Sequence, residues 1–405
     1  MSEITKLTFV GDIMCKADMV DRYGDENGNY DFSGVFEGMK KYFAGSDFVL
    51  GNLETPISMD GAGLTKEKYS FNTPYQFAID AHEAGIDFVA TANNHCLDRG
   101  IRGIDSTIKS LNKVGLLHTG VFSNRKKAPM VIEVNGLKIG IMAYTYGTNA
   151  FANGNYLKKS DYWRVNLFQN QELSNPLTRW SFNHAKTLPA KIYNKTVKFL
   201  VPSNRGRAVY ERREFSFRCK RKLLKEIRHM RLQKPDIMIM YMHAGGQYNP
   251  VATDETKKLS SFLIRNGIDI VAGSHEHVVH GGNFENISNN KIETYSLGNF
   301  CGVAGVCDEP FDKMAEYSIA LNCYISVADK KIQKATYSIL KTVPDGNKGI
   351  KTVPVYELMK ELTTEEARTK LLLDTLEIAK RFSGNATKLN NSVLEEYDIG
   401  SSASF

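Results

Sequence analysis

The chain has 405 residues, of which 42% are hydrophobic and 24% are charged, enough to bury a core as one large domain or two. No run of about 18 consecutive apolar residues occurs, so no membrane span is predicted; the six cysteines form no CxxC pair, which argues against a disulfide framework and favours reduced thiols. The formal net charge of +7 is local, because residues 205–234 carry twelve Lys and Arg against three Glu.

The N-terminal residues, MSEITKLTFVGD, run almost directly into a predicted strand. They lack the basic region, the long apolar stretch and the small-residue cleavage site of a signal peptide. We therefore expect a cytoplasmic protein that is soluble or peripheral to the membrane.

Short apolar runs that end in polar residues recur along the chain and predict buried strands that stop at polar loops. These runs are LTFVGD (7–12), DFVLGN (47–52), IDFVATANNH (86–95), KIGIMAY (138–144), DIMIMYMHAGG (236–246), IDIVAGSH (268–275) and ETYSLGNF (293–300). Helical patterns, each followed by a Gly as a C-cap, lie between several of them at 74–85, 100–114 and 254–267. This alternation predicts an α/β fold, in which the functional site lies beyond the carboxyl ends of the strands.

Two segments interrupt or end the alternation. Residues 150–215 are rich in Asn, Tyr, Phe and Arg without a clear period, and we interpret them as an insertion that could serve as a lid. Near the C-terminus, Thr363-x-x-Glu366 forms a capping box before a helix of about five turns that ends at Gly384. We therefore divide the chain into a main domain, 1–345, and a C-terminal helical extension, 346–405, whose last residues we expect to be weakly ordered.

The basic stretch, residues 205–234, contains Leu223, Leu224, Ile227 and Met230 at helical spacing. One interpretation is an amphipathic helix with a solvated basic face. The other is a docking surface for a polyanion, such as an anionic polymer, a membrane surface or RNA. No RNA-binding aromatic motif and no helix-turn-helix pattern occurs, so the sequence argues against a dedicated nucleic-acid role.

Polar side chains follow several of the predicted strands at the point where each strand ends. They are Asp12; Asn52 and Glu54; Asn93, Asn94, His95 and Asp98; His243; His275 and His277; and Asn299. Carboxylates combined with imidazoles suit Mn, Fe or Zn better than Ca, which prefers oxygen ligands alone. Taken singly, Asp12 could cap a helix, Glu54 could be a solvated turn residue, and His95 could be a satisfied buried histidine. Their shared position at strand ends favours a common site.

The stretch GSHEHVVHGG, residues 273–282, holds three histidines and a glutamate directly after the apolar run IDIVA. Two imidazoles in His-x-His spacing, on a loop leaving a strand, can point the same way and hold a cation. A polar loop with unrelated histidines is the alternative.

The order of these motifs resembles the CapA family of capsule-synthesis proteins, which are linked to poly-gamma-glutamate and belong to the calcineurin-like metallophosphoesterase superfamily. The matching motifs are FVGD, GNLETPI, ANNHCLDRG, MHAGGQY, GSHEHV and YSLGNF. The resemblance covers roughly residues 5–325 and fits the 150–215 insertion poorly. It implies a four-layer α-β-β-α sandwich, in which two mixed sheets are flanked by helices and the site lies at one edge.

The resemblance also implies a centre of two divalent metal ions, Mn, Fe or Zn. The roles it implies are Asp12 and His277 as ligands of the first metal, Asn94, His243 and His275 as ligands of the second, and Glu54 as the bridging carboxylate. Two such ions lower the pKa of a bound water and hold a phosphoryl oxygen. The side chain of His95 would lie close by as a general acid or a charge stabiliser, since histidine titrates near neutrality.

Several neighbours of these residues allow two interpretations. Asp98 could orient His95 or cap the helix that follows. Glu276 could be a partner of a metal ligand or a solvated residue, and we favour the solvated side chain. Asn299 could contact the site or shape a turn, and we slightly favour the turn.

Some positions depart from the superfamily pattern or from the family's own pattern, among them Glu276, which stands where the family has the proline of His-Pro-His. The first motif usually reads Asp-x-His, but Met14 stands where the imidazole would be, so the first metal has fewer protein ligands. Asn52 stands at the usual aspartate position, two residues before Glu54. The family's H-x-G-x-E-Y reads HAGGQY, with Gln247 at the acidic position.

Two functions follow as expectations. The first is a metal-dependent hydrolase or transferase that acts in the biosynthesis of capsule, poly-gamma-glutamate or another anionic cell-surface polymer. The alternative is a non-catalytic polymer-binding or assembly factor that retains a vestigial metal site. The expected partners are an anionic polymer or a phosphoester substrate and the capsule-synthesis machinery at the membrane.

Overall fold

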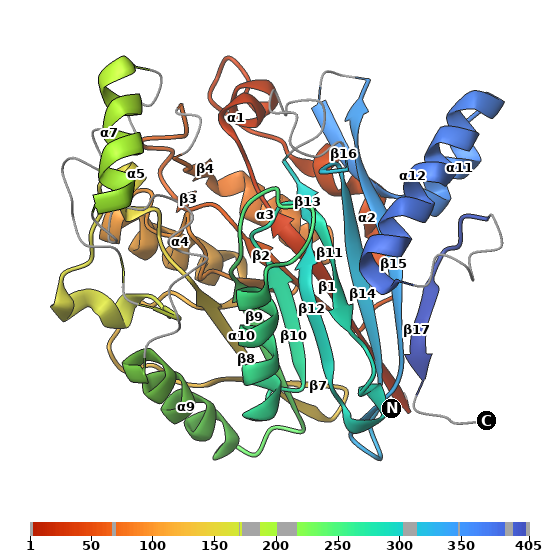
Figure 1. Cartoon of the computed structure of the whole chain (residues 1–405). Helices are drawn as coiled ribbons and strands as arrows, with labels where there is room; N and C mark the ends of the chain where they lie inside the picture. Colours follow the sequence, from red (N-terminus) through yellow and green to blue (C-terminus); the bar gives the residue numbers. More distant parts are fainter. Residues whose placement is uncertain are drawn as a thin grey trace.

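The computed structural model describes residues 3–66, 70–169, 171, 187–200, 217–302, 314–346, 349–384 and 392–401. Two β-sheets pack face to face, and helices cover the outer face of each sheet (Figure 1). This arrangement confirms the α/β class and the four-layer α-β-β-α sandwich that the sequence predicted.

The larger sheet has nine strands within the described residues, and β1 lies near its centre. In spatial order they are β16 (Gly349–Pro354), β15 (Lys331–Asp345), β14 (Tyr317–Ser326), β1 (Ile4–Ile13), β2 (Phe48–Leu53), β5 (Phe88–Ala90) and β6 (Leu117–Thr119), with β13 (Asn299–Cys301) beside β1 and β17 (Tyr397–Ser401) beside β15. Strands β1, β2, β5 and β6 are parallel, so their carboxyl ends meet at one edge. On its other side β1 pairs antiparallel with β14, so that Ile4 stands opposite Ser326.

The smaller sheet supplies a second set of parallel strands. Its order is β11 (Val279–Asn283), β12 (Ile292–Leu297), β10 (Ile270–Ser274), β9 (Ile237–His243), β8 (Leu137–Thr145) and β7 (Met130–Val134). Strands β8, β9, β10 and β12 run parallel. The sequences of β9 and β10 are nearly continuous apolar runs because both faces of these strands are buried. A separate short pair, β3 (Ile57–Ser58) and β4 (Thr73–Pro74), lies outside both sheets.

The main core lies between the two sheets. Phe9 of β1 and Phe88 of β5 face Tyr241 of β9, with ring centroids 6.3 and 6.4 Å apart. The helices on the outer face of the larger sheet are α1 (Ala17–Tyr23), α2 (Ser33–Phe43), α3 (Tyr75–Glu83) and α4 (Gly100–Val114). Those on the outer face of the smaller sheet are α9 (Phe217–Arg231) and α10 (Asp254–Arg265).

The three predicted helices are confirmed. The pattern at 74–85 is α3, the pattern at 100–114 is α4, and the pattern at 254–267 is α10. Helix α4 ends at Gly115 in the left-handed conformation, with φ of 89°, as a C-cap requires. Helix α10 begins after Thr253, whose side chain accepts a hydrogen bond from the backbone N–H of Thr256.

The residues after 345 contribute to the same sandwich. Helices α11 (Val355–Glu361) and α12 (Glu365–Ser383) follow β16, and Phe382 of α12 packs on Tyr337 of β15 with ring centroids 4.8 Å apart (Figure 1). Strands β16 and β17 both pair with β15. The prediction that Thr363 caps α12 was wrong by one position. The capping residue is Thr364, whose side chain accepts a hydrogen bond from the N–H of Ala367. The domain boundary itself stays a prediction.

The insertion is described only in part, as α5 (Ala150–Asn153), a 3-10 turn (Lys159–Arg164) and α7 (Leu188–Leu200), so its role as a lid lies outside the described residues. In α9 the side chains of Leu223, Ile227 and Met230 are buried against the smaller sheet, which confirms an amphipathic helix there. Residues 205–216 of the basic stretch lie outside the described residues. Among the helices that are described, none is long and apolar enough to cross a bilayer.

The close approach of β1 to the turn at Gly298 predicts that a side chain at Gly11 destabilises the protein. A Cβ atom at Gly11 would lie 1.9 Å from the carbonyl oxygen of Gly298, the same oxygen that accepts a hydrogen bond from the N–H of Asp12 at 3.0 Å. Gly11→Ala must therefore push β1 away from this turn, and we expect a loss of about 2–3 kcal/mol in the free energy of unfolding, measured by urea denaturation. Gly34→Ala in α2, where the nearest atom would lie 3.7 Å away, is the control and should be neutral or slightly stabilising. Equal stability of the two variants would contradict this account.

Candidate metal centre

Strands of both sheets deliver buried side chains to one edge of the sandwich. From the larger sheet come Asp12 in β1, Glu54 directly after β2, and Asn94 and His95 in the loop after β5. From the smaller sheet come His243 at the end of β9 and His275 and His277 in the loop after β10. Every one of these side chains is at most 5% exposed. The structure therefore brings together all six predicted metal ligands and the predicted general acid.

Asp12 is held in place by both sheets. Its Oδ1 accepts a hydrogen bond of 2.7 Å from the side-chain amide of Asn52, and its Oδ2 accepts one of 3.0 Å from the backbone N–H of His275. Because the carboxylate is completely buried, burial raises the pKa of Asp12 to about 6, and these hydrogen bonds lower it in part. Asp12 therefore acts as a fixed carboxylate at the junction of the sheets, and its alternative role as a helix cap is excluded.

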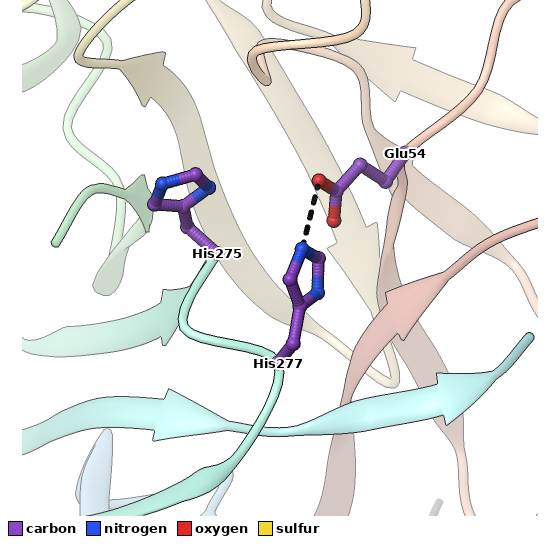
Figure 2. Close-up of side chains that lie close together, drawn as sticks. All are labelled: Glu54, His275 and His277. Atoms are coloured by element: carbon purple, nitrogen blue, oxygen red, sulfur yellow. Dashed lines mark ion pairs between the residues drawn. The ribbon is translucent and has the colours of Figure 1, made fainter. Parts of the chain in front are cut away.

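Glu54 is fully buried, and within the described part of the chain neither of its carboxylate oxygens has a hydrogen-bond donor. Its Oε1 lies 3.6 Å from Nε2 of His243 and 3.8 Å from Nε2 of His277. Figure 2 shows Glu54 and His277 pointing toward one another. Burial, and then the negative charge of Asp12, raise the pKa of Glu54 well above its usual range, while the positive charge of Lys16 lowers it. A buried carboxylate without a donor is costly, and a cation is the partner that this environment fits.

His243 faces the same point from the smaller sheet. Its Nδ1 lies 2.9 Å from Oγ of Ser274 and 3.3 Å from the amide nitrogen of Asn52. Its Nε2 lies 2.7 Å from Oδ1 of Asn94 and faces Glu54. Burial lowers the pKa of His243 well below its usual range, so the imidazole is neutral at physiological pH. A neutral imidazole nitrogen and an amide oxygen side by side are ligand atoms that suit a divalent transition metal.

The loop that carries His275 and His277 has a strained backbone. Both residues have positive φ values, 100° and 61°, which residues other than glycine rarely adopt. Asn299 fixes His277 from two sides, because its Oδ1 accepts from Nδ1–H at 2.9 Å and its Nδ2 donates to the backbone oxygen of His277 at 3.0 Å. Burial lowers the pKa of His277 to about 3, and its Nε2 is left to face Glu54.

Among the residues that the structure describes, two sets of three side chains have ligand atoms within 4.8 Å of one another. One set is Glu54, His275 and His277, and the other is Asp12, Glu54 and His243. Glu54 belongs to both sets, as a bridging carboxylate would. The sets place His275 with His277, whereas the family resemblance implies that these two histidines serve different metals.

His95 and Asp98 form a pair beside the ligand cluster. Nδ1 of His95 lies 2.7 Å from Oδ2 of Asp98, which also accepts a hydrogen bond from the backbone N–H of Phe71 at 2.7 Å. The other oxygen of Asp98 accepts from the side chain of Asn153 at 3.0 Å. The ring of Phe71 stacks on His95 with centroids 4.1 Å apart. Asp98 therefore orients His95, and the cap position of α4 belongs to Arg99.

Two sequence interpretations are corrected by the structure. Asn299 does not merely shape a turn, because its side chain positions His277. Glu276 was expected to be solvated but is 0% exposed, because Gly245 has no side chain at the place where a Cβ would lie 1.8 Å from Oε1 of Glu276. Nδ1 of His280 lies 3.8 Å from the same oxygen. In the sequence, the glycine two residues after His243 was the feature that could have indicated this close packing.

Several neighbours of the ligands have positioning roles that were not predicted from the sequence. Asn52 holds Asp12, Phe71 stacks on His95, and the ring of Tyr146 lies 4.6 Å from that of His275. Of these, only Asn52 carried a signal, since it ends a strand in the same way as the ligands do.

Comparison with known proteins identifies similar sequences. The model of the family described as bacterial capsule synthesis protein PGA_cap matches residues 6–303. The capsule biosynthesis protein CapA of Bacillus anthracis is 23% identical over 391 residues, covering 93% of this chain and 78% of that protein. The PGA biosynthesis protein CapA of Bacillus subtilis is 22% identical over 302 residues, covering 74% of this chain and 63% of that protein. A phosphatase structure from Mycoplasma pneumoniae aligns with a TM-score of 0.41 and 17% identity, covering 84% of this chain and 94% of that one.

The raised pKa of Asp12 predicts a pH-dependent effect of Asp12→Asn on the protein stripped of metal by a chelator. The folded chain keeps the proton on Asp12 up to about pH 6, whereas the unfolded chain loses it near the ordinary value of 3.8. The stability that Asp12 contributes below pH 3.8 is therefore lost as the pH rises through 6. The stability of Asp12→Asn relative to the wild type should rise from pH 4 to pH 7 by up to about 3 kcal/mol.

Chemical denaturation at several pH values measures this difference. Glu133→Gln, at an exposed position in β7, is the control and should show a flat difference. A flat difference for Asp12→Asn as well would show that its carboxylate ionises normally in the folded chain.

Proposed function

The chain belongs to the family of bacterial capsule synthesis proteins, and we propose that it is a metal-dependent hydrolase or transferase in the biosynthesis of capsule or poly-gamma-glutamate. The observation that carries this proposal is Glu54, a fully buried carboxylate at the end of a strand of the larger sheet. Its Oε1 faces the imidazoles of His243 and His277 from the smaller sheet, and it has no hydrogen-bond donor among the described residues. A protein that only needed this edge to be packed would tolerate an apolar side chain here, at a lower cost in desolvation.

The residues that would hold divalent ions are the six strand-end side chains. They are Asp12, Glu54, Asn94, His243, His275 and His277. Mn, Fe or Zn fits the mixture of carboxylate, amide and imidazole groups. When bound, such ions polarise an oxygen of the substrate and lower the pKa of a bound water. The chain's own contribution is to hold these groups rigidly, through Asn52, Ser274 and Asn299.

His95 would serve as the proton donor to the leaving group. Asp98 holds Nδ1 of the imidazole, so that Nε2 is the nitrogen left to exchange a proton with a substrate. The stacked ring of Phe71 excludes water from one face of His95 and fixes its plane. Proton transfer from a positioned histidine typically contributes a factor of about 10²–10⁴ to the rate.

The substrate classes that we propose are phosphoesters and gamma-glutamyl amides of an anionic polymer. Lys16 supports an anionic substrate, because its half-buried side chain follows β1 and its positive charge acts on both Glu54 and His277. A cation at the edge of a cluster of carboxylates favours the approach of negatively charged groups.

One observation favours the second candidate function, that of a polymer-binding or assembly factor. The exposed face of α9 carries Arg221, Lys222, Lys225 and Arg228. The acid of this helix, Glu226, is hydrogen-bonded by the hydroxyl of Tyr144. This face could dock an anionic polymer or the capsule-synthesis machinery at the membrane. A cytoplasmic location stays a prediction.

Metal content tests the centre directly. In protein purified without chelators or an affinity metal, we expect elemental analysis to find about two Mn, Fe or Zn ions per chain, because Glu54 is shared by two sets of ligands. His275→Ala/His277→Ala should lose metal, whereas His229→Ala, at an exposed position in α9, should retain it. Wild-type protein that takes up no Mn or Zn on reconstitution would exclude the enzyme and leave the α9 surface as the functional feature.

The role of His95 is tested by His95→Ala and Asp98→Asn. Loss of the proton donor should lower the turnover of phosphoester or gamma-glutamyl amide substrates by about 10²–10⁴-fold for His95→Ala. Asp98→Asn, which leaves the imidazole in place but changes its partner, should have a smaller effect. Metal content should stay unchanged in both variants. If His95→Ala loses metal together with activity, His95 is a ligand and not a proton donor.

A further inference from the structure

Gln247 lies against the nitrogen of His277 that faces Glu54. The side-chain nitrogen of Gln247 is 3.2 Å from Nε2 of His277. Nδ1 of the same imidazole donates its hydrogen to Asn299. The neutral ring therefore has its lone pair on Nε2, and Gln247 must present its NH₂ group to it. This hydrogen bond uses the lone pair that His277 would offer to a cation.

The turn that carries Gln247 is fixed to the loop of the metal ligands. The backbone N–H of Tyr248 donates to the carbonyl oxygen of Glu276 at 2.8 Å, and Nε2 of His280 donates to the carbonyl oxygen of Asn249 at 2.7 Å. Tyr248 has a positive φ of 60°, and its ring lies 5.3 Å from that of His277. These contacts fix the backbone of the turn beside His277, so the fold places Gln247 within reach of this imidazole.

The corresponding neighbour of His243 is different. There, Nε2–H of His243 donates to Oδ1 of Asn94 at 2.7 Å. A shift of this hydrogen to Nδ1, which lies 2.9 Å from Oγ of Ser274, frees both atoms for a cation without moving either side chain. An amide oxygen and an imidazole nitrogen can bind one cation together, whereas an amide NH₂ group is a donor and cannot act as a ligand. The two histidines are thus paired with amides of opposite polarity.

We propose that Gln247 is a gate on the cation position served by His277. A cation binds Nε2 of His277 only after the NH₂ group of Gln247 has moved away, so this position fills at higher metal concentration than the position served by His243 and Asn94. The inference rests on the proposed metal centre and adds an order of occupancy to it. Full occupancy of the centre then depends on the ambient concentration of metal.

Calorimetric titration of the stripped full-length protein with Mn²⁺, with electron paramagnetic resonance to count bound ions, tests the gate without an activity assay. Wild-type protein should show one tighter and one weaker site. Gln247→Ala should tighten only the weaker site, by about 3–10-fold, because one competing hydrogen bond is removed. Gln247→Glu, which replaces the donor by a carboxylate, should tighten it by more than tenfold. Gln333→Ala, in β15, is the matched control and should leave both constants unchanged.

The outcomes separate the gate from the metal centre itself. Weaker binding in Gln247→Ala would show that Gln247 is a ligand, and equal binding would show that it has no influence; either result overturns the gate while Mn²⁺ still binds. If neither the wild type nor any variant binds Mn²⁺, the metal centre and the gate are both overturned. Circular dichroism of each variant confirms that the fold is retained.

Discussion

The buried carboxylate of Glu54 is the constraint around which this edge of the molecule is organised. It lies at the end of a strand of one sheet and faces imidazoles delivered by the other, so both sheets must keep their relative position for the cluster to exist. The polar groups nearby, such as Asn52, Ser274 and Asn299, bind the neighbours of Glu54 and not its oxygens. They determine which atoms of Asp12, His243 and His277 face the centre. The packing therefore fixes the ligands and leaves the charge of Glu54 for a cation to balance.

The positions of the ligands could be predicted because strand ends are visible in a sequence. Apolar runs ending at Asp12, His243 and His275 indicate where each buried strand stops, and parallel strands bring those ends to one edge. The buried face of α9 could also be predicted, because apolar residues at helical spacing identify the side of a helix that packs, whatever the partner is.

Features that depend on contacts between distant segments could not be predicted in this way. The burial of Glu276 requires that a turn without a Cβ atom, at Gly245, packs on it from another strand. The role of Asn299 depends on a hydrogen bond to a residue 22 positions earlier in the chain. Strands β16 and β17 were missed because their pairing with β15 is a tertiary event, and short strand patterns near a predicted helix carry little signal of their own.

The place of β1 in the larger sheet has a consequence for how the protein is made. Strand β1 is paired on one side with β2, but its other edge is completed by β14, whose residues are synthesised some three hundred positions later. Until then a growing chain exposes an apolar strand edge that can pair with another chain. We therefore expect nascent chains to need protection from aggregation until β14 is made. A truncation before Tyr317 would remove the strand that closes this edge, although every predicted metal ligand lies before it.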